Sequence, residues 1–151
     1  MKLGTLCYIE KDNKTLFLHR IKKENDIHKD KWIGLGGKVE AGESPEECVI
    51  REVEEESGLK ISKPNLRGVL TFPNFHGEDW YVFLYTTSNF IGELIESDEG
   101  KLEWIENDKI MKLNMSKGDK LFLEWLKENK MFSAKFIYEG ENLLDYNVSW
   151  Y

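Results

Sequence analysis

The sequence predicts an α/β/α sandwich, in which helices cover both faces of a mixed β-sheet. Segments rich in β-branched and aromatic residues outnumber the amphipathic helical segments, and the two kinds do not alternate regularly along the chain. Residues 80–86 are apolar on both of their alternating sides, which indicates a strand that is buried on both faces. A sheet between two layers of helices accounts for both observations.

The N-terminal segments are expected to form a hairpin and a third, irregular strand. Residues 3–9 and 15–21 have strand-like patterns and flank the turn-like residues 11–14. Residues 22–31 are polar and are expected to form a loop. Residues 32–40 are again strand-like, but glycines interrupt them, so this strand is expected to be irregular.

The clearest helix signal follows that strand. Ser44 is expected to cap the N-terminus, Pro45 suits the first helical position, and Glu47 completes a capping box with Ser44. The helix is expected to continue to about Ser57 and to end at Gly58, because glycine is favoured directly after a helix C-terminus.

The rest of the chain is expected to extend the sheet and to add a second helix. Strands are expected at 66–72 and 80–86, which flank a turn at 74–78, and at 102–105. Residues 117–129 carry their large apolar side chains on one side, which predicts an amphipathic helix. Strands at 132–138 and 143–150 are expected to form a terminal hairpin.

Length and composition are those of a single domain spanning residues 1–151. The mass is 17.8 kDa and 40% of the residues are hydrophobic, which excludes the disordered and fibrous classes. The formal net charge is −7. This charge argues against a passive nucleic-acid or membrane-surface binder, which needs a basic face. A phosphate-bearing partner would need a divalent cation to attract it.

No feature of the sequence points to export or to a membrane. Cys7 and Cys48 lie in apolar surroundings without metal-ligand spacing, so we expect reduced core cysteines. The N-terminus leads directly into strand-like sequence without a signal-peptide pattern, and the longest apolar run, 80–85, is too short to span a bilayer. A cytoplasmic protein is therefore expected, with a monomer favoured over an oligomer.

Three glutamates of the first expected helix are spaced to hold a cation. Glu52, Glu55 and Glu56 lie at i, i+3 and i+4, so their carboxylates share one face and repel one another unless a cation lies between them. Hard carboxylate oxygens suit Mg²⁺ or Mn²⁺ rather than zinc. Arg51 can pair with Glu55, and the backbone of residues 34–37 can offer carbonyls to a metal or N–H groups to phosphate. Taken alone, such acidic faces are more often merely solvated.

The joint spacing of these residues decides between a cation site and a merely solvated acidic face. It resembles the Nudix box, G-x5-E-x7-R-E-U-x-E-E-x-G-U with U an aliphatic residue. The positions that carry the resemblance are Gly37, Glu43, Arg51, Glu52, Val53, Glu55, Glu56, Gly58 and Leu59. The family resemblance implies an αβα sandwich that uses a divalent metal to hydrolyse a nucleoside diphosphate linked to another moiety.

The resemblance also assigns roles. The metal ligands it implies are Gly36, Gly37, Glu52, Glu55, Glu56 and Glu99. Glu56 is the first choice as combined ligand and general base, with Glu55 next. Glu99 either joins the metal site from a later loop or is a solvated turn residue.

The remaining motif residues are expected to support this site. Arg51 is expected to act in catalysis by holding Glu55 or Glu43 rather than by touching substrate. Gly37, Glu43 and Gly58 are expected to be structural.

The resemblance extends beyond the box to Thr5 and Leu6, the Lys22 and Lys23 pair, residues 34–39 and 66–72, Glu99, and the C-terminal hairpin of residues 132–136 and 144–146. These segments resemble the oxidised purine nucleoside triphosphate hydrolases, the 8-oxo-dGTP diphosphatase branch of the MutT-like enzymes. The resemblance implies that Thr5, Phe72 and Asp119 line a base pocket and that Lys23 reaches the phosphates. The substrate-binding set also includes Ile33, which stands where mammalian-type members carry a pocket asparagine. Ser116 stands in place of their stacking tryptophan, and Gly118 in place of one of two pocket aspartates.

The expected activity is cleavage of an oxidised purine nucleoside triphosphate to the monophosphate and pyrophosphate, with Mg²⁺ (or Mn²⁺) as cofactor. Pro73 lies roughly where ADP-ribose hydrolases often carry a proline, so hydrolysis of ADP-ribose or of a dinucleoside polyphosphate stays open. A further alternative is a sensor module that binds nucleotide or RNA without turnover. Such modules usually lose box glutamates, and this chain keeps them. The expected partner is a small nucleotide, without nucleic acid or membrane.

Overall fold

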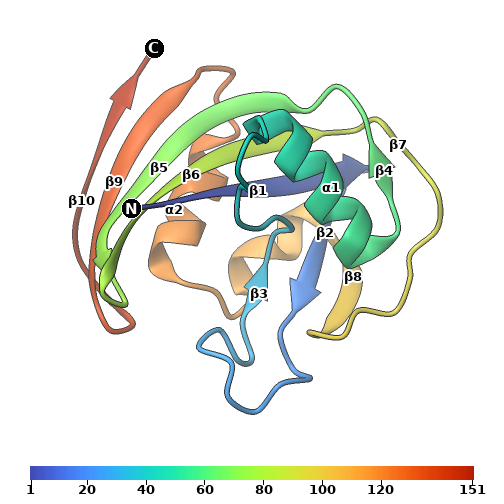
Figure 1. Cartoon of the computed structure of the whole chain (residues 1–151), viewed down its shortest axis with the longest axis horizontal. Helices are drawn as coiled ribbons and strands as arrows, with labels where there is room; N and C mark the ends of the chain where they lie inside the picture. The colour runs from blue at the N-terminus through green and yellow to red at the C-terminus, as the bar shows by residue number, and fades with distance from the viewer.

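The computed structural model describes all residues, Met1–Tyr151, and shows a mixed β-sheet between two helical layers (Figure 1). Helix α1 (Pro45–Ser57) lies on one face of the sheet. Helix α2 (Lys117–Trp125) and the short 3₁₀ helix η1 (Asn107–Lys112) lie on the other. The predicted α/β/α sandwich with a mixed sheet is confirmed.

The large sheet has eight strands in the order β10-β9-β5-β6-β1-β2-β3, with β8 also paired to β2. Their bounds are β1 Lys2–Lys11, β2 Lys14–His19, β3 Trp32–Ile33, β5 Asn65–Phe75, β6 Glu78–Thr87, β8 Lys101–Glu106, β9 Phe132–Glu139 and β10 Asn142–Trp150. The pairs β1–β6 and β5–β9 are parallel, and the other pairs are antiparallel. The sheet is therefore mixed, as the sequence predicts.

The period-2 alternation of the strands divides the core into two clusters. In β1, Cys7 and Ile9 pack with Val49 and Val53 of α1. Tyr8, between them, packs on the other face with Phe122 of α2. The two cysteines are free and buried, as expected.

Helix α1 begins and ends where the sequence predicts. The Ser44 hydroxyl accepts the Glu47 N–H at 3.0 Å, and the Glu47 carboxylate accepts the Ser44 N–H at 2.9 Å. Gly58 follows the last turn with a φ of 82°. These caps hold the helix that carries the glutamates in a defined position on the sheet.

Several features differ from the predicted elements. The strand expected at 32–40 is reduced to β3 (Trp32–Ile33), and β2 ends at His19 instead of residue 21. The structure also has a small separate sheet of β4 (Lys60–Ile61) and β7 (Phe90–Ile91), and the helix η1. The sequence did not predict these elements, because each has too few residues to produce a periodic pattern. Helix α2 ends at Trp125 instead of residue 129. Arg67 takes the carbonyls of Leu126 and Glu128 as hydrogen-bond acceptors, at 2.8 and 2.9 Å, so the helix does not continue through them.

The turn between β5 and β6 is also tighter than predicted, because Phe75 still pairs with Glu78. None of the helices has the length and apolar character needed to cross a membrane.

Candidate active site

A single guanidinium gathers the carboxylates at the start of the site. Arg51 donates from Nε and Nη2 to the two oxygens of Glu43, at 2.7 and 3.0 Å. Its Nη1 lies 2.8 Å from Glu52 and 3.3 Å from Glu55, so the i, i+4 pair expected from the sequence is present. These hydrogen bonds from Arg51, with one from the Glu40 N–H, lower the pKa of Glu43 to about 2. The motif residues Glu43 and Arg51 therefore form one fixed ion pair.

The glycine segment approaches the helix so closely that only bare backbone fits. A Cβ on Gly37 would lie 2.4 Å from the Glu52 carboxyl carbon, and a Cβ on Gly36 would lie 2.0 Å from the Thr5 carbonyl oxygen. The Gly37 carbonyl accepts the Thr5 N–H at 2.8 Å, whereas the Gly36 carbonyl accepts no hydrogen bond. Of the two carbonyls predicted as ligands, that of Gly36 is the one left free.

The two adjacent glutamates Glu55 and Glu56 lie in different environments. The Glu55 side chain is 59% exposed and pairs with Arg51 on the flank of the helix. Glu56 turns inward and accepts the Gly36 N–H at 2.9 Å. Burial raises the pKa of Glu56 to about 8, and the nearby Glu99 and Glu52 carboxylates contribute to the increase. The hydrogen bond from Gly36 acts in the opposite direction and lowers the pKa. Glu56 is thus a protonatable group at neutral pH in the metal-free protein, a property expected of an acid–base residue.

Glu99 approaches this group from the segment before β8. Its carboxylate lies 3.4 Å from Nη1 of Arg20, and it contributes to the raised pKa of Glu56. The structure therefore brings Glu99 toward the predicted acids. We call Glu52, Glu55, Glu56 and Glu99, with the Gly36–Gly37 backbone, the acid site.

The chemistry of the acid site fits a hard divalent cation. Burial and the neighbouring Glu55 and Glu40 charges raise the pKa of Glu52, although its contact with Arg51 lowers it, so the single Arg51 charge does not fully offset the crowded carboxylates. Carboxylate oxygens and one free carbonyl are the ligands that Mg²⁺ and Mn²⁺ prefer. No three His, Cys, Asp or Glu side chains already surround one cation position. Glu52 and Glu56 must therefore turn from Arg51 and Gly36 to share a cation.

A cavity of about 440 Å³ opens near the acid site. Its lining residues are Ile27, His28, Lys31, Ile33, Phe72, Phe75, His76, Glu78, Trp80, Val82, Ser116, Asp119, Tyr138, Gly140 and Glu141. Because Phe72, Phe75, Trp80 and Tyr138 supply most of its apolar wall, we call it the aromatic cavity. Ile33 on the cavity wall and Gly36 in the acid site are three positions apart, so their Cα atoms are separated by at most about 11 Å. The two regions therefore lie within the length of one nucleotide.

Only part of the predicted substrate-binding set lies on this cavity. Ile33, Phe72 and Asp119 line it, as the resemblance implies. Thr5 does not, because its position in the β1 alternation directs it under α1, where its hydroxyl lies 3.4 Å from the Gly37 carbonyl oxygen. Lys23 is exposed, outside the cavity and without an ion pair. The basic side chain that lines the cavity is instead Lys31, which pairs with Glu141 at 3.3 Å.

Asp119 is free to contact a ligand because another residue caps its helix. The N-cap of α2 is Ser116, whose hydroxyl accepts the Asp119 N–H at 3.3 Å, so the Asp119 carboxylate does not cap the helix. Burial raises the pKa of Asp119 to about 6, although the hydrogen bond with Ser116 and the charge of Lys31 both lower it. Asp119 is therefore a recessed carboxyl group that titrates just below neutral pH.

Tyr138 is a cavity residue that sequence reasoning missed. Its hydroxyl accepts the Gly118 N–H at 2.8 Å, and a Cβ on Gly118 would lie 2.5 Å from that oxygen. The glycine that replaces an aspartate of the resembled branch thus makes room for a phenol. The signal was present in the unexplained glycine, but only the fold shows that β9 faces α2 there.

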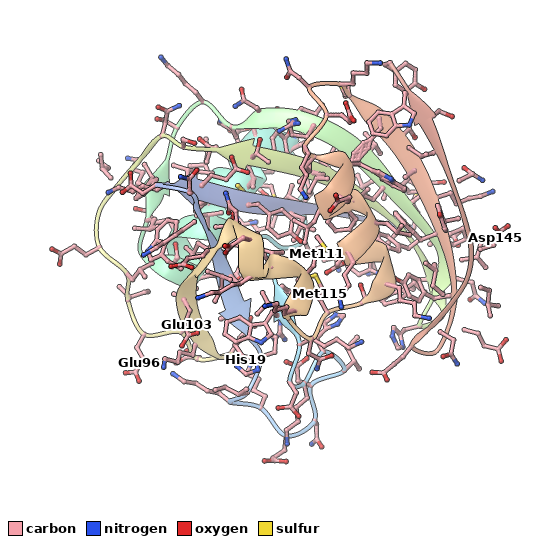
Figure 2. The ribbon with its side chains drawn as sticks, turned by 180° about the vertical axis from the view of Figure 1, so that it is seen from behind. His19, Glu96, Glu103, Met111, Met115 and Asp145 are labelled. Carbon is pink, nitrogen blue, oxygen red and sulfur yellow. The ribbon has the colours of Figure 1, made fainter.

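A larger groove of about 590 Å³ lies elsewhere, between α2 and β10. Met111 and Asp145 are on its two sides in Figure 2. It contains none of the predicted site residues, and it is open along its length. We therefore assign the candidate site to the acid site and the aromatic cavity.

Comparison with known proteins agrees with this fold. The NUDIX domain model matches residues 2–126, so the chain belongs to the Nudix family. It is 34% identical over 151 residues to YvcI, an uncharacterised Nudix hydrolase of Bacillus subtilis, covering 95% of this chain and 92% of that protein. A crystal structure of a mutator MutT protein from Bacillus halodurans superimposes with a TM-score of 0.86 at 30% identity, covering 98% of this chain and 97% of the other.

The protein is accordingly a Nudix pyrophosphohydrolase, a class that generally uses divalent cations and acts on small nucleotides. Two relatives have named activities. An oxidized purine nucleoside triphosphate hydrolase of Danio rerio is 34% identical over 124 residues, covering 81% of this chain and 79% of that protein. An ADP-ribose pyrophosphatase of Methanocaldococcus jannaschii is 36% identical over 107 residues, covering 70% of this chain and 62% of that protein.

Proposed function

We propose that this enzyme hydrolyses a purine nucleoside triphosphate, with oxidised purines such as 8-oxo-dGTP as its class of substrate, to the monophosphate and pyrophosphate. The observation that carries the proposal is the aromatic cavity, which contains the recessed Asp119 carboxyl. Its wall residue Ile33 is within about 11 Å of chain from Gly36 in the acid site. Aromatic walls can stack a purine, and a single carboxyl can accept hydrogen bonds from its edge. The similarity to the Danio rerio enzyme supports the same substrate class.

In this proposal Glu52, Glu56 and Glu99, with the Gly36 carbonyl, hold Mg²⁺. The bound cation supplies charge neutralisation on the phosphates and a more acidic water. Glu56 is the first candidate to take the water proton. Its carboxyl is shielded from solvent and close to the other acids, and its pKa is about 8. Glu55, which is exposed and paired with Arg51, is the second candidate.

Arg51 and Glu43 act as positioning residues. The bidentate pair holds the guanidinium so that Nη1 lies between Glu52 and Glu55, and it makes no contact with the aromatic cavity. Its effect on catalysis therefore passes through the placement of the acids.

The base selectivity is expected to be weaker than in typical members of the branch. Ile33 cannot hydrogen-bond a base edge, and Ser116, the cap of α2, cannot stack on one. Asp119 and Tyr138 are the polar groups left on that side of the cavity, while Phe72 and Phe75 provide stacking surface. A cytoplasmic, monomeric enzyme that sanitises the nucleotide pool is part of the same proposal.

The test is a panel of canonical and oxidised nucleoside triphosphates, ADP-ribose and dinucleoside polyphosphates with Mg²⁺, with the products separated by chromatography. The proposal expects a monophosphate and pyrophosphate, no turnover in EDTA, and a rise in melting temperature on adding Mg²⁺. Release of two phosphorylated nucleosides or sugars would instead identify the ADP-ribose or dinucleoside polyphosphate activity. Nucleotide binding without any product would identify a sensor module.

A further inference from the structure

The residue that joins the acid site to the aromatic cavity is Arg20, which lies outside the Nudix box. It directly follows β2, and it begins the segment 20–31, which we call the pocket loop. The Arg20 N–H donates to the Lys31 carbonyl at 2.9 Å, and its own carbonyl accepts the Asp30 N–H at 2.6 Å. The backbone of Arg20 therefore closes the pocket loop at its base.

The Arg20 side chain holds the middle of the same loop. Its Nε donates to Asp26 at 2.6 Å, in a pair whose side chains are only 16% and 4% exposed. The second Asp26 oxygen accepts the His28 N–H at 2.9 Å. Three pocket-loop residues, Ile27, His28 and Lys31, line the aromatic cavity. The Arg20–Asp26 pair therefore anchors the loop that carries these three wall residues. Removing one partner of this buried pair would leave the other charge unpaired.

The other end of the guanidinium faces the acid site. Arg20 Nη1 lies 3.4 Å from one oxygen of Glu99, and no other side chain pairs with that carboxylate. The Lys22 N–H donates to the Glu99 carbonyl at 3.4 Å. Gly100 packs so tightly on the end of β2 that a Cβ there would lie 1.9 Å from the His19 carbonyl oxygen. The Lys22 ammonium also lies 3.5 Å from Glu96, which is in the same segment before β8.

We propose that Arg20 is a positioning residue that couples the two regions, orienting Glu99 for the cation and holding the cavity wall through Asp26. It rests on the proposed function, because it takes Glu99 as a cation ligand. Arg20 contacts Glu99 as an ion pair. Loss of a partner that orients a metal-binding carboxylate lowers metal affinity about 10- to 100-fold. The Arg20 fork suits this double task, since a planar guanidinium can bond two carboxylates at once.

Two binding measurements on three single variants test the role of Arg20. Mn²⁺ binding is measured on the nucleotide-free protein by calorimetry, and GMP and 8-oxo-GMP binding is measured in EDTA. Arg20→Met is expected to lower both affinities, about tenfold or more for Mn²⁺. Glu99→Gln is expected to lower only Mn²⁺ affinity, and Asp26→Asn only nucleotide affinity. The double variant Arg20→Met/Glu99→Gln is expected to bind Mn²⁺ no more weakly than Glu99→Gln alone.

Two controls keep the test decisive. Arg67→Met removes another well-bonded arginine, which donates to Thr86, Leu126 and Glu128, and it is expected to lower the melting temperature without changing either affinity. Arg20→Lys keeps the charge but not the fork, and it replaces Arg20→Met if that variant does not fold. It is expected to weaken Mn²⁺ binding as well.

Three results would overturn the proposal. They are wild-type or tighter Mn²⁺ binding by Arg20→Met, additive losses in the double variant, and an equal loss in Arg67→Met. If these occur while the wild-type enzyme binds Mn²⁺ and releases pyrophosphate, only the role of Arg20 fails. If the wild-type enzyme binds no Mn²⁺ at all, the proposed function fails with it.

Discussion

The acid site takes most of its side chains from a single helix, whereas the aromatic cavity takes its walls from four separate stretches of chain, 27–33, 72–82, 116–119 and 138–141. In the acid site, Arg51 links Glu43, Glu52 and Glu55 in one network. In the cavity, the recessed Asp119 makes no ion pair, and the apolar part of the cavity wall is mainly aromatic. Chemistry is thus concentrated in a cross-linked element, and recognition is spread over segments that only the fold brings together.

This difference predicts how each region tolerates change. A substitution in the acid site disturbs several charges at once, so it should remove turnover. A substitution in the cavity removes one contact among many, so it should alter selectivity while turnover persists. The following experiments test that contrast.

The largest effect is expected from Glu56→Gln. Loss of a cation ligand and general base should lower kcat about a thousandfold or more, because general acid–base catalysis alone contributes about 10²–10⁴-fold. The matched control is Glu54→Gln on the same helix, where the side chain is exposed and makes no ion pair. Steady-state pyrophosphate release measures both. A near wild-type rate for Glu56→Gln would show that the buried acid is neither ligand nor base.

The same variant should raise the stability of the metal-free protein at alkaline pH. The pKa of Glu56 is about 8 in the folded protein against an ordinary value of 4.5, so the folded state binds this proton more tightly. The resulting stabilisation is complete below pH 4.5 and is lost as pH rises to about 8. At pH 8.5 in EDTA, Glu56→Gln avoids a buried charge and should melt a few degrees higher, a gain on the order of a few kcal/mol.

Thermal melts of both proteins between pH 5 and pH 9 measure this difference, with Glu54→Gln as control. Glu52, whose pKa is also raised by burial, leaves some pH dependence in the variant. A melting-temperature difference that does not grow with pH would contradict the burial of Glu56.

Arg51→Lys is expected to give an intermediate effect. Lysine keeps the charge but cannot form the bidentate pair with Glu43 or reach Glu52 and Glu55 at the same time. We expect kcat to fall about 10- to 100-fold and Mn²⁺ affinity to fall with it, as for other partners of metal ligands, while KM changes little. A change in substrate affinity alone, with Mn²⁺ binding untouched, would place Arg51 on the substrate instead.

The smallest effect is expected in the cavity. Asp119→Ala removes a hydrogen-bond acceptor from a recessed site, which is worth about 1–3 kcal/mol, so discrimination between 8-oxo-dGTP and dGTP should fall about tenfold. Its melting temperature should stay near wild type, because Ser116 caps α2. Asp145→Ala, in the groove between α2 and β10 that Asp119 does not line, is the matched control (Figure 2).

Ser116→Ala completes the comparison within the cavity. Loss of the cap should lower stability by about 1 kcal/mol and leave substrate preference unchanged. A wild-type preference for 8-oxo-dGTP of many thousandfold would contradict the weak selectivity expected from Ile33 and Ser116. It would assign recognition to other residues, such as Phe72 or Phe75.

The local structure of the acid site was readable from sequence because its determinants are local. The capping box and Gly58 set the ends of α1, and the i, i+3 and i+4 spacing alone places the glutamates on one face. The strands were found for the same reason, since alternation shows which residues face the core. The two-residue strands β4 and β7 gave no such signal.

The sequence by itself therefore determined the sandwich, the helix that carries the acids and the Arg51–Glu55 contact. Only the tertiary structure decided that Glu56 is half-buried while Glu55 is exposed, because that depends on the Gly36 backbone reaching the helix from another part of the chain. It also decided that Thr5 faces α1, and that Tyr138 fills the space beside Gly118. Ionisation and cavity shape depend on which distant segments remove water from a side chain, and a linear pattern does not contain that information.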